Sequence, residues 1–271
     1  MVNKKLSQEQ IQTIIDLTRN GSSVREVAQI IDVMKGVVYH HSKKIKGNVM
    51  NPIKILSNDE ELIGEFIGLF AGDGCVNVNN YRHRIFLYFN IKEKEYVDKL
   101  IENVLMKLFG KRPMSWRDEN RLNLYYYSKN IHDLIKKYLT WDRNQRKTYS
   151  VRLYENEYSV GFAIGFLRGC LDSDGHISEN KIEFATTSTG LADNITQFLD
   201  KFGISYKLSL YKEKRTNRHD IFHIYVHKIH HQKFRMLVKP RNLKGTNALA
   251  GIRTQASGFH LLENGRPQSY H

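Results

Sequence analysis

Two segments that lie 101 residues apart repeat one another, and this internal repeat is the strongest constraint that the sequence places on the fold. "FIGLFAGDG" occupies residues 66–74 and "FLRGCLDSDG" occupies residues 166–175. Each is an apolar run that ends in Asp-Gly, with Asp73 in the first copy and Asp174 in the second. A repeat of this size indicates two structurally similar half-domains.

Glycines recur at every fourth position of both copies, although glycine costs an interior helical position about 1 kcal/mol relative to alanine. They are Gly64, Gly68 and Gly72 in the first copy and Gly161, Gly165 and Gly169 in the second. Small residues at i and i+4 let two helix backbones approach closely. We therefore predict close packing of these helices. An ordinary helix contact with an Asp-Gly cap explains one copy, but not two copies with matched acids.

The segments that follow the two copies have the same order. In the first half, the patterns predict strands at 75–79, 84–91, 114–117 and 121–127, with helices at 94–110 and 130–139. In the second half, they predict strands at 176–178, 181–186, 206–212 and 221–227, with helices at 190–203 and 228–237. The predicted fold class is α+β, with two pseudo-symmetric αββαββα half-domains.

Residues 1–46 predict a small all-α unit ahead of the half-domains. Segments 7–10 and 23–26 both have the form of a capping box before apolar residues at helical spacing. With a third helix in "MKGVVYHHSKKIK", the unit resembles a helix-turn-helix module, in which the third helix enters a DNA groove. The predicted contacts are Lys35, Tyr39, His40, Lys43 and Lys44. A three-helix unit with a purely structural role is the alternative.

Composition divides the chain into five predicted segments. The helical unit at 1–46 precedes a linker at 47–58 that carries Gly, Pro and several Asn residues. The first half-domain is predicted at 59–155 and the second at 156–245. Residues 246–271 show no periodicity, and we interpret them as a tail, disordered or not native to the protein.

The formal net charge of +14 indicates a polyanionic partner, and nucleic acid is the leading candidate. A basic protein that is merely soluble is the alternative. An anionic membrane surface is disfavoured because the basic residues are scattered rather than massed on one amphipathic helix.

Several sequence features bear on where the protein is found. No run approaches 18 uninterrupted apolar residues, so no membrane span is predicted. The first ten residues lack the apolar core of a signal peptide. Cys75 and Cys170 are the two cysteines, too few for a disulfide framework. We expect an intracellular protein, cytoplasmic or organellar, and not a secreted one.

The two repeated segments resemble the paired motifs of the LAGLIDADG homing endonucleases, a family named after its nine-residue consensus. The central glycine of the motif falls at Gly68 and Gly169, and its penultimate acid at Asp73 and Asp174. The resemblance covers roughly residues 59–245. It implies a monomer with internal pseudo-two-fold symmetry, in which the half-domains form a saddle. It also implies that the motif helices pack side by side and deliver both acids to one site.

The resemblance further implies metal-dependent cleavage of both strands of duplex DNA at a long recognition site. Two adjoining carboxylates need a cation, and hard oxygen ligands suit Mg²⁺, with Mn²⁺ as another candidate. The predicted metal ligands are Asp73, Asp174 and the backbone carbonyls of Gly72 and Ser173.

Basic residues close to the metals are implied as well. Lys147 in "NQRKTY" and Lys244 in "RNLKGT" are the candidates, and with Asp73 and Asp174 they make up the predicted catalytic set. The copies differ at the sixth motif position, which is Ala71 in the first copy and Asp172 in the second.

Alternation along the strands predicts the side chains that contact DNA. In 84–91, Ile85, Leu87 and Phe89 are expected to face the helices, which leaves the intervening residues on an open face. Arg, Lys, Asn, Tyr and His side chains can hydrogen-bond base edges and phosphates, whereas a merely solvated face usually carries more Glu and Thr. The predicted DNA-binding residues of the half-domains are Arg84, Tyr88, Asn90, Arg117, Arg121, Asn123, Tyr125, Lys207, Ser209, Tyr211, Lys212, Arg215, His223 and Tyr225.

Two other functions stay open at this point. Some members of the family act as maturases, so intron RNA is an alternative partner. A DNA-binding regulator that does not cleave is the other alternative, although two retained acids speak against it. The chain lacks the start and the terminal Asn of an intein, so we expect a free-standing enzyme encoded in a mobile intron or as a separate mobile gene.

Overall fold

The structure, a computed structural model, describes residues 6–20, 22–46, 53–79, 82–214 and 219–242. The chain divides into two compact units, Met1–Pro52 and Ile53–His271, and each is described by itself. Within the described residues, no helix has the length and apolar character needed to cross a membrane.

The first unit contains three helices, α1 (Gln8–Arg19), α2 (Val24–Ile30) and α3 (Lys35–Lys46). Both predicted capping boxes are present: the side chains of Ser7 and Ser23 accept hydrogen bonds from the backbone N–H groups of Gln10 and Glu26. The unit has its own small core of Ile14, Val27, Ala28 and Val38. Three packed helices agree with the predicted all-α unit, and its role in DNA binding stays a prediction.

In the second unit, the first half-domain has the predicted αββαββα order. Its strands are β1 (Gly74–Asn79), β2 (Arg82–Asn90), β3 (Met114–Asp118) and β4 (Arg121–Tyr127). Its helical segments are α4 (Glu60–Asp73), η1 (Ile91–Glu93), α5 (Lys94–Leu100), the π-helical η2 (Ile101–Leu105), α6 (Met106–Phe109) and α7 (Lys129–Tyr138). The helix predicted over 94–110 therefore contains a π-helical stretch, and it ends where Gly110 adopts a φ of 59°.

The second half-domain repeats this order. Its strands are β7 (His176–Ser178), β8 (Lys181–Thr186), β9 (Tyr206–Tyr211) and β10 (Ile221–Val226). Its helical segments are α9 (Val160–Asp174), α10 (Thr189–Lys201), η3 (Lys228–His230) and α11 (His231–Val238). Between the halves lie β5 (Leu139–Thr140), α8 (Lys147–Ser150) and β6 (Arg152–Leu153), where β5 and β6 pair with each other.

The two sheets have equivalent topologies. The first has the order β1-β2-β4-β3 and the second β7-β8-β10-β9, and every pair in both is antiparallel. One face of each sheet is buried against helices, as shown by Ile85, Leu87 and Phe184, which are at most 3% exposed. The predicted α+β class with two αββαββα half-domains is confirmed.

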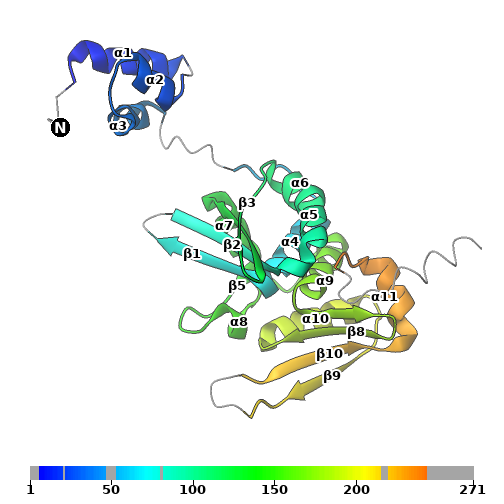
Figure 1. Cartoon of the computed structure of the whole chain (residues 1–271). Helices are drawn as coiled ribbons and strands as arrows, with labels where there is room; N and C mark the ends of the chain where they lie inside the picture. The colour runs from blue at the N-terminus through cyan, green and yellow to red at the C-terminus, as the bar shows by residue number, and fades with distance from the viewer. Residues whose placement is uncertain (1–5, 21, 47–52, 80–81, 215–218, 243–271) are drawn as a thin grey trace, which may run out of the picture. The chain divides into compact units, whose positions relative to one another are not determined.

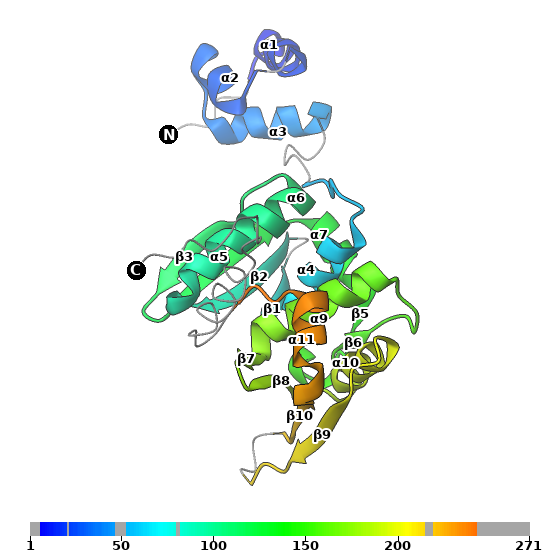
Figure 2. The ribbon, with the colours of Figure 1, turned by 90° about the vertical axis from the view of Figure 1, so that its right-hand side faces the viewer.

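Helices α4 and α9 lie side by side where the half-domains join (Figures 1 and 2). Their backbones touch at four of the repeated glycines. A Cβ atom on Gly68 would lie 2.3 Å from the carbonyl oxygen of Phe166, and one on Gly165 would lie 1.9 Å from that of Glu61. Gly64 and Gly169 are equally tight, with clashes at 2.2 Å against backbone oxygens of the facing helix. The predicted close packing is therefore present, and only glycine fits at these four positions.

Candidate functional site

Asp73 and Asp174 are the last residues of α4 and α9, so the packed helix pair carries both acids to the same end. Gly72 lies against the second acid, since a Cβ on Gly72 would be 3.0 Å from the Asp174 Oδ2 atom and 2.2 Å from the Ser173 hydroxyl. Asp174 is exposed and Asp73 is half-buried. Both carboxylates are thus presented at the surface where the two half-domains meet.

Lys147, at the start of α8, reaches the end of α4. Its Nζ atom donates hydrogen bonds to the backbone oxygens of Phe70 at 2.6 Å, Ala71 at 2.7 Å and Gly72 at 3.2 Å. The last carbonyls of a helix lack partners within the helix and carry a partial negative charge. An ammonium group satisfies both needs, so Lys147 stabilises the helix end that carries Asp73.

The charge of Lys147 is finely balanced. Burial lowers the pKa of its ammonium group, while the carboxylates of Asp174 and Asp73 raise it, and the net result is a pKa of about 8. Both acids therefore act on the same ammonium group. With a pKa of about 8, that group is mostly charged at neutral pH.

The end of α9 is built differently. Ser173 occupies the position equivalent to Gly72, is 3% exposed, and donates its hydroxyl to the backbone oxygens of Gly169 at 3.0 Å and Cys170 at 3.1 Å. Lys244, the predicted counterpart of Lys147, lies outside the described residues.

The donor set at this end of the helices fits a hard divalent cation that retains water. Two carboxylates and one ammonium group leave a net negative charge, which a cation would neutralise. Among the residues that the structure describes, no group of three or more His, Cys, Asp and Glu side chains is placed to hold a metal. Mg²⁺ suits such a site, because it keeps several waters and binds through one or two carboxylates together with substrate phosphates. The Gly72 carbonyl already accepts a hydrogen bond from Lys147, so the carboxylates are the stronger ligand candidates.

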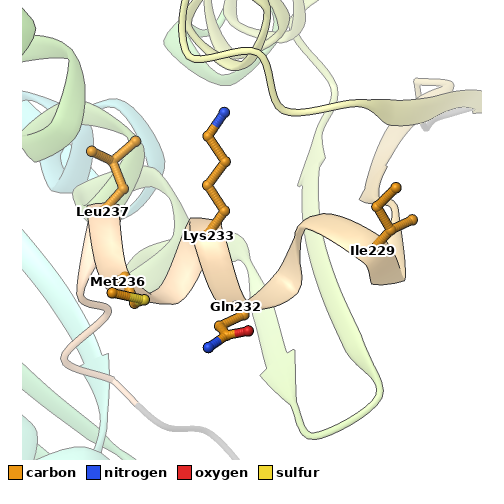
Figure 3. Close-up of a pocket in the computed structure, with 5 residues that line it drawn as sticks. All are labelled: Ile229, Gln232, Lys233, Met236 and Leu237. Carbon is orange, nitrogen blue, oxygen red and sulfur yellow. The ribbon is translucent and has the colours of Figure 1, made fainter.

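A hollow of about 220 Å³ opens beside Asp174. It is bounded by the ends of the motif helices and by the second sheet, and its lining includes Ala71, Thr148, Asp174, Ala185, Thr187 and Ile221. A larger hollow of about 500 Å³ lies along α11 (Figure 3), lined by Ile229, Gln232, Lys233, Met236 and Leu237. In that view Lys233 and Gln232 point to opposite sides of the helix, and none of the predicted site residues lines this second hollow.

An ion cluster is buried between the motif helices, and the sequence patterns did not reveal it. Arg168 is 2% exposed and binds Glu65 at 2.8 Å and Glu61 at 2.5 Å, while its Nε atom donates to the Val238 carbonyl at 2.6 Å. Arg241 Nε lies 2.7 Å from the same Glu65 carboxylate. Charged residues inside otherwise apolar helices were the available signal, but nothing in the sequence shows which residues pair.

Asp172, the acid at the sixth motif position, fastens the chain that follows α11. Its carboxylate accepts the backbone N–H groups of Arg241 at 3.2 Å and Asn242 at 3.0 Å. The Asn242 side chain in turn bridges the Asp172 carbonyl at 2.9 Å and Glu93 of the first half-domain at 2.8 Å. Burial raises the pKa of Asp172, and the hydrogen bonds from these N–H groups lower it. Burial is the larger effect, and the resulting pKa is about 7. The difference from Ala71 is thus structural: Asp172 ties both halves to the C-terminal segment.

On the first sheet, the strand register defines the open face, because directly paired residues share a face. Phe86 pairs with Tyr125, and Tyr88 pairs with Asn123, opposite in direction to the buried Leu87 and Leu124. The predicted residues Arg84, Tyr88, Asn90, Arg121, Asn123 and Tyr125 all lie on this face. Asn123 is nevertheless 3% exposed, so neighbouring side chains cover it.

Arg117, one of the predicted DNA contacts, does not share the open face, and its contact with DNA stays a prediction. Arg117 pairs with Leu122, which is 6% exposed and faces the helices. The open-face residues of β3 are instead Met114 and Trp116, which pair with Tyr125 and Asn123. Trp116 was missed because the short strand "MSWR" gives too few alternations to fix its direction.

On the second sheet, the predicted residues Lys207, Ser209, His223 and Tyr225 lie on the open face, since His223 pairs with Ser209 and Tyr225 with Lys207. Tyr211 pairs with Ile221 on the same face, and Lys212 directly follows β9 and is exposed. Arg215 lies outside the described residues. Glu183 and Lys181 also belong to this face, and sequence reasoning did not include them.

The first unit presents its predicted contacts on α3. Lys35, Tyr39, His40 and Lys43 are all exposed, whereas Val38 between them is fully buried. The side chain of Lys44 lies outside the described residues.

Comparison with known proteins finds a family match in the second half-domain and solved structures that share the fold. Residues 161–238, which span most of the second half-domain, match the model of the LAGLIDADG-like domain family. This match confirms the motif-based recognition over the second half-domain. The family match does not reach the first unit, so its likeness to a helix-turn-helix module stays a prediction.

Individual relatives are distant. One uncharacterized protein of Methanocaldococcus jannaschii is 26% identical over 242 residues, which are 82% of this chain and 84% of the relative. A second uncharacterized protein of the same organism is 26% identical over 61% of this chain and 63% of its own length. Among solved structures, I-DmoI in complex with DNA and Ca has a TM-score of 0.50 at 14% identity, and the match covers 73% of this chain and all of I-DmoI. At that identity the likeness shows a shared fold.

Proposed function

We propose that the protein is a site-specific endonuclease that hydrolyses both strands of duplex DNA with a divalent cation. The observation that carries the proposal is the pair of glycine-packed helices, which presents Asp73 and Asp174 at one surface with the Lys147 ammonium group beside them. A protein that only binds DNA gains nothing from two adjoining carboxylates, because their repulsion disfavours the ionised forms.

The fold and the charge support the same function. The chain shares its fold with I-DmoI, a homing endonuclease whose structures include complexes with DNA and Ca and with nicked target DNA and Mn. The formal net charge of +14 suits a DNA partner. The open faces of both sheets carry basic, tyrosine and amide side chains able to contact phosphates and base edges.

In the proposed chemistry, Asp73 and Asp174 would hold the cation, with Mg²⁺ or Mn²⁺ as candidates. A bound divalent cation supplies charge neutralisation for the phosphodiester and an acidified water. Lys147 keeps the end of α4 in place through its three carbonyl contacts and sets a positive charge next to the acids. With a pKa of about 8, its Nζ atom can also give up a proton near neutral pH.

The sheets would position the duplex. Arg84, Asn90, Arg121 and Tyr125 in the first half, and Lys207, Ser209 and Tyr225 in the second, are the proposed contacts of the two half-sites. Lys35, Tyr39 and Lys43 on α3 would add contacts from the first unit. The protein is proposed to act as a monomer, since one chain supplies both acids.

Cleavage of a randomised duplex library tests the proposal directly. Wild-type protein is incubated with Mg²⁺ or with EDTA, beside Asp73→Asn, Asp174→Asn and the control Asp193→Asn, which removes an exposed acid of α10. We expect metal-dependent cutting at one long site. Each motif variant should lose more than about a hundredfold in rate, because even outer partners of metal ligands are worth about 10–100-fold, and the control should cut normally.

Three results would contradict the proposal. Binding of duplex DNA without cutting under any condition would leave a DNA-binding regulator on this fold. Selective binding of structured RNA over duplex DNA would indicate the maturase alternative. Cutting that persists in EDTA, or in both motif variants, would remove Asp73 and Asp174 from the active site.

A further inference from the structure

The open face of the first sheet carries an apolar patch of Tyr88, Met114, Trp116 and Tyr125, packed around Phe86, which is itself only 7% exposed. Ring centroids of Phe86 and Trp116 lie 5.6 Å apart, those of Trp116 and Tyr125 5.3 Å apart, and those of Phe86 and Tyr88 5.8 Å apart. Tyr88, Met114 and Trp116 are 36%, 41% and 42% exposed. Apolar side chains that gather into one exposed patch mark interaction sites more often than single exposed ones do.

At the positions equivalent to the patch the second sheet is mostly polar, and the register shows this position by position, although Tyr211 and Ile221 lie farther along the same face. The residue two positions after each acid provides the alignment of the two sheets. Cys75, after Asp73, pairs with Phe86, and His176, after Asp174, pairs with Glu183. Following these pairs across each sheet matches the patch to its counterparts: Phe86 to Glu183, Tyr88 to Ala185, Met114 to Lys207, and Trp116 to Ser209. Only the tyrosine is retained, as Tyr125 and Tyr225.

Ion pairs organise the polar face of the second sheet. Glu183 lies 2.5 Å from Lys181 and 2.7 Å from the Nδ1 atom of His223. Burial alone would raise the pKa of Glu183, but the hydrogen bonds from Lys181 and His223 outweigh it and hold that pKa below its usual value. This half of the surface therefore offers charges and hydrogen-bonding groups, whereas the first half offers rings and a thioether.

The chemistry of duplex DNA limits what an apolar surface can recognise there. In the major groove, the base edges present hydrogen-bond donors and acceptors, and the C5-methyl group of thymine is the apolar group among them. Base faces are stacked inside the duplex and are not available to a sheet. Arg84 and Arg121 flank the patch on the same face, with the Arg84 guanidinium 4.7 Å from the Tyr127 ring centroid. Their charge suits the neighbouring phosphates.

We propose that the apolar patch of the first half-domain reads thymine methyl groups, so that the half-site under this sheet is rich in thymine. The second half-domain reads its half-site through hydrogen bonds instead. Trp116 is the central specificity residue, because it contacts both Phe86 and Tyr125 and is the most exposed ring of the patch. This inference rests on the proposed binding of duplex DNA.

Replacement of thymine by deoxyuridine tests the inference, since it removes the methyl group and leaves every hydrogen-bonding group in place. The duplex selected from the randomised library is prepared in two forms, each with all thymines of one half-site replaced. Dissociation constants are measured in EDTA, so that the DNA stays intact. In one half-site we expect affinity to fall about fourfold per contacted methyl, and in the other by less than about twofold.

The variant Trp116→Ala tests whether the loss of affinity caused by deoxyuridine depends on the apolar patch. Trp116 is 42% exposed on an edge strand, so its removal leaves the core unchanged. In this variant the loss caused by deoxyuridine should shrink to less than about twofold. Ser209→Ala, at the equivalent position of the second sheet, should keep the full loss.

Several outcomes would overturn the inference while leaving the endonuclease intact: a selected site without thymine in either half, deoxyuridine losses that are equal in both halves, or losses that persist in Trp116→Ala. Tighter binding of single strands than of duplex, dependent on Trp116, would make the patch a base-stacking platform and would also overturn it. Failure to bind any duplex would overturn the proposed function first, and this inference with it.

Discussion

At the scale of single residues, the motif glycines are required by contact and not by backbone conformation. Gly64, Gly68, Gly165 and Gly169 each place the facing backbone so near that a Cβ atom would fall within 2.3 Å of a carbonyl oxygen. Gly161 was grouped with them by its spacing, yet a Cβ there would meet its nearest neighbour, the Glu61 nitrogen, at 3.6 Å. The four-residue spacing therefore predicted one close contact, at Gly161 in the first turn of α9, that the structure does not contain.

Gly68→Ala and Gly161→Ala form a matched pair of substitutions. The first forces two helix backbones apart and should lower the free energy of unfolding by about 3 kcal/mol. The second meets ordinary van der Waals contacts and should leave stability unchanged or raise it by up to about 1 kcal/mol, through better helix propensity. Urea unfolding followed by circular dichroism measures both. Equal losses in the two variants would show that helix packing does not depend on these contacts.

At the scale of elements, α4 and α9 are held by two unlike interactions: glycine contacts along the length of the helix pair and an ion cluster around the buried Arg168. The cluster joins Glu61 and Glu65 of α4 to Arg168 of α9 and to Arg241 after α11. Glu65 is fully buried, so its carboxylate depends on these two guanidinium groups. The loss of one partner would leave a buried charge poorly compensated.

Arg168→Met should therefore destabilise the protein by about 3–5 kcal/mol. Arg112→Met is the control, because the Arg112–Glu102 pair is exposed on both sides, and its loss should cost less than about 1 kcal/mol. Thermal unfolding of both variants at neutral pH gives the comparison. A small effect of Arg168→Met would mean that water or a rearranged Arg241 compensates Glu65.

Local sequence patterns predicted the helices and strands well, but they did not predict which side chains pair across the fold. The strand at 121–127 was predicted with the bounds of β4, and the glycine period correctly indicated touching helices. The ion cluster escaped because Arg168 meets Glu65 across 103 residues of sequence, and nothing local encodes that contact. The side-chain directions in β3 could not be predicted, so Arg117 was chosen in place of Trp116. Every residue of this edge strand is exposed, and its sequence therefore need not alternate between apolar and polar residues.

For the whole molecule, the excess positive charge predicts that DNA binding weakens steeply with salt. Each phosphate contact releases counterions, so a protein that makes six to ten contacts loses about a thousandfold or more in affinity between 50 and 200 mM salt. Lys207→Gln should reduce the log–log slope by about one. Trp116→Ala should lower the affinity without changing the slope, because a ring contact displaces no counterion. An affinity independent of salt would contradict nucleic-acid binding altogether.

The interlocked helix pair also has a mechanical consequence. Its glycine contacts leave no room for the half-domains to slide, and the Asn242 bridge between Asp172 and Glu93 ties the same two halves a second time. Two separate sets of contacts of this kind resist rotation of one half-domain against the other. Smoothly bending a duplex of 20–30 base pairs by about 40–90° costs only about 1–6 kcal/mol. When the proposed complex forms, the placement of the two half-domains against each other is therefore fixed in advance, and the DNA is the partner that must bend to fit it.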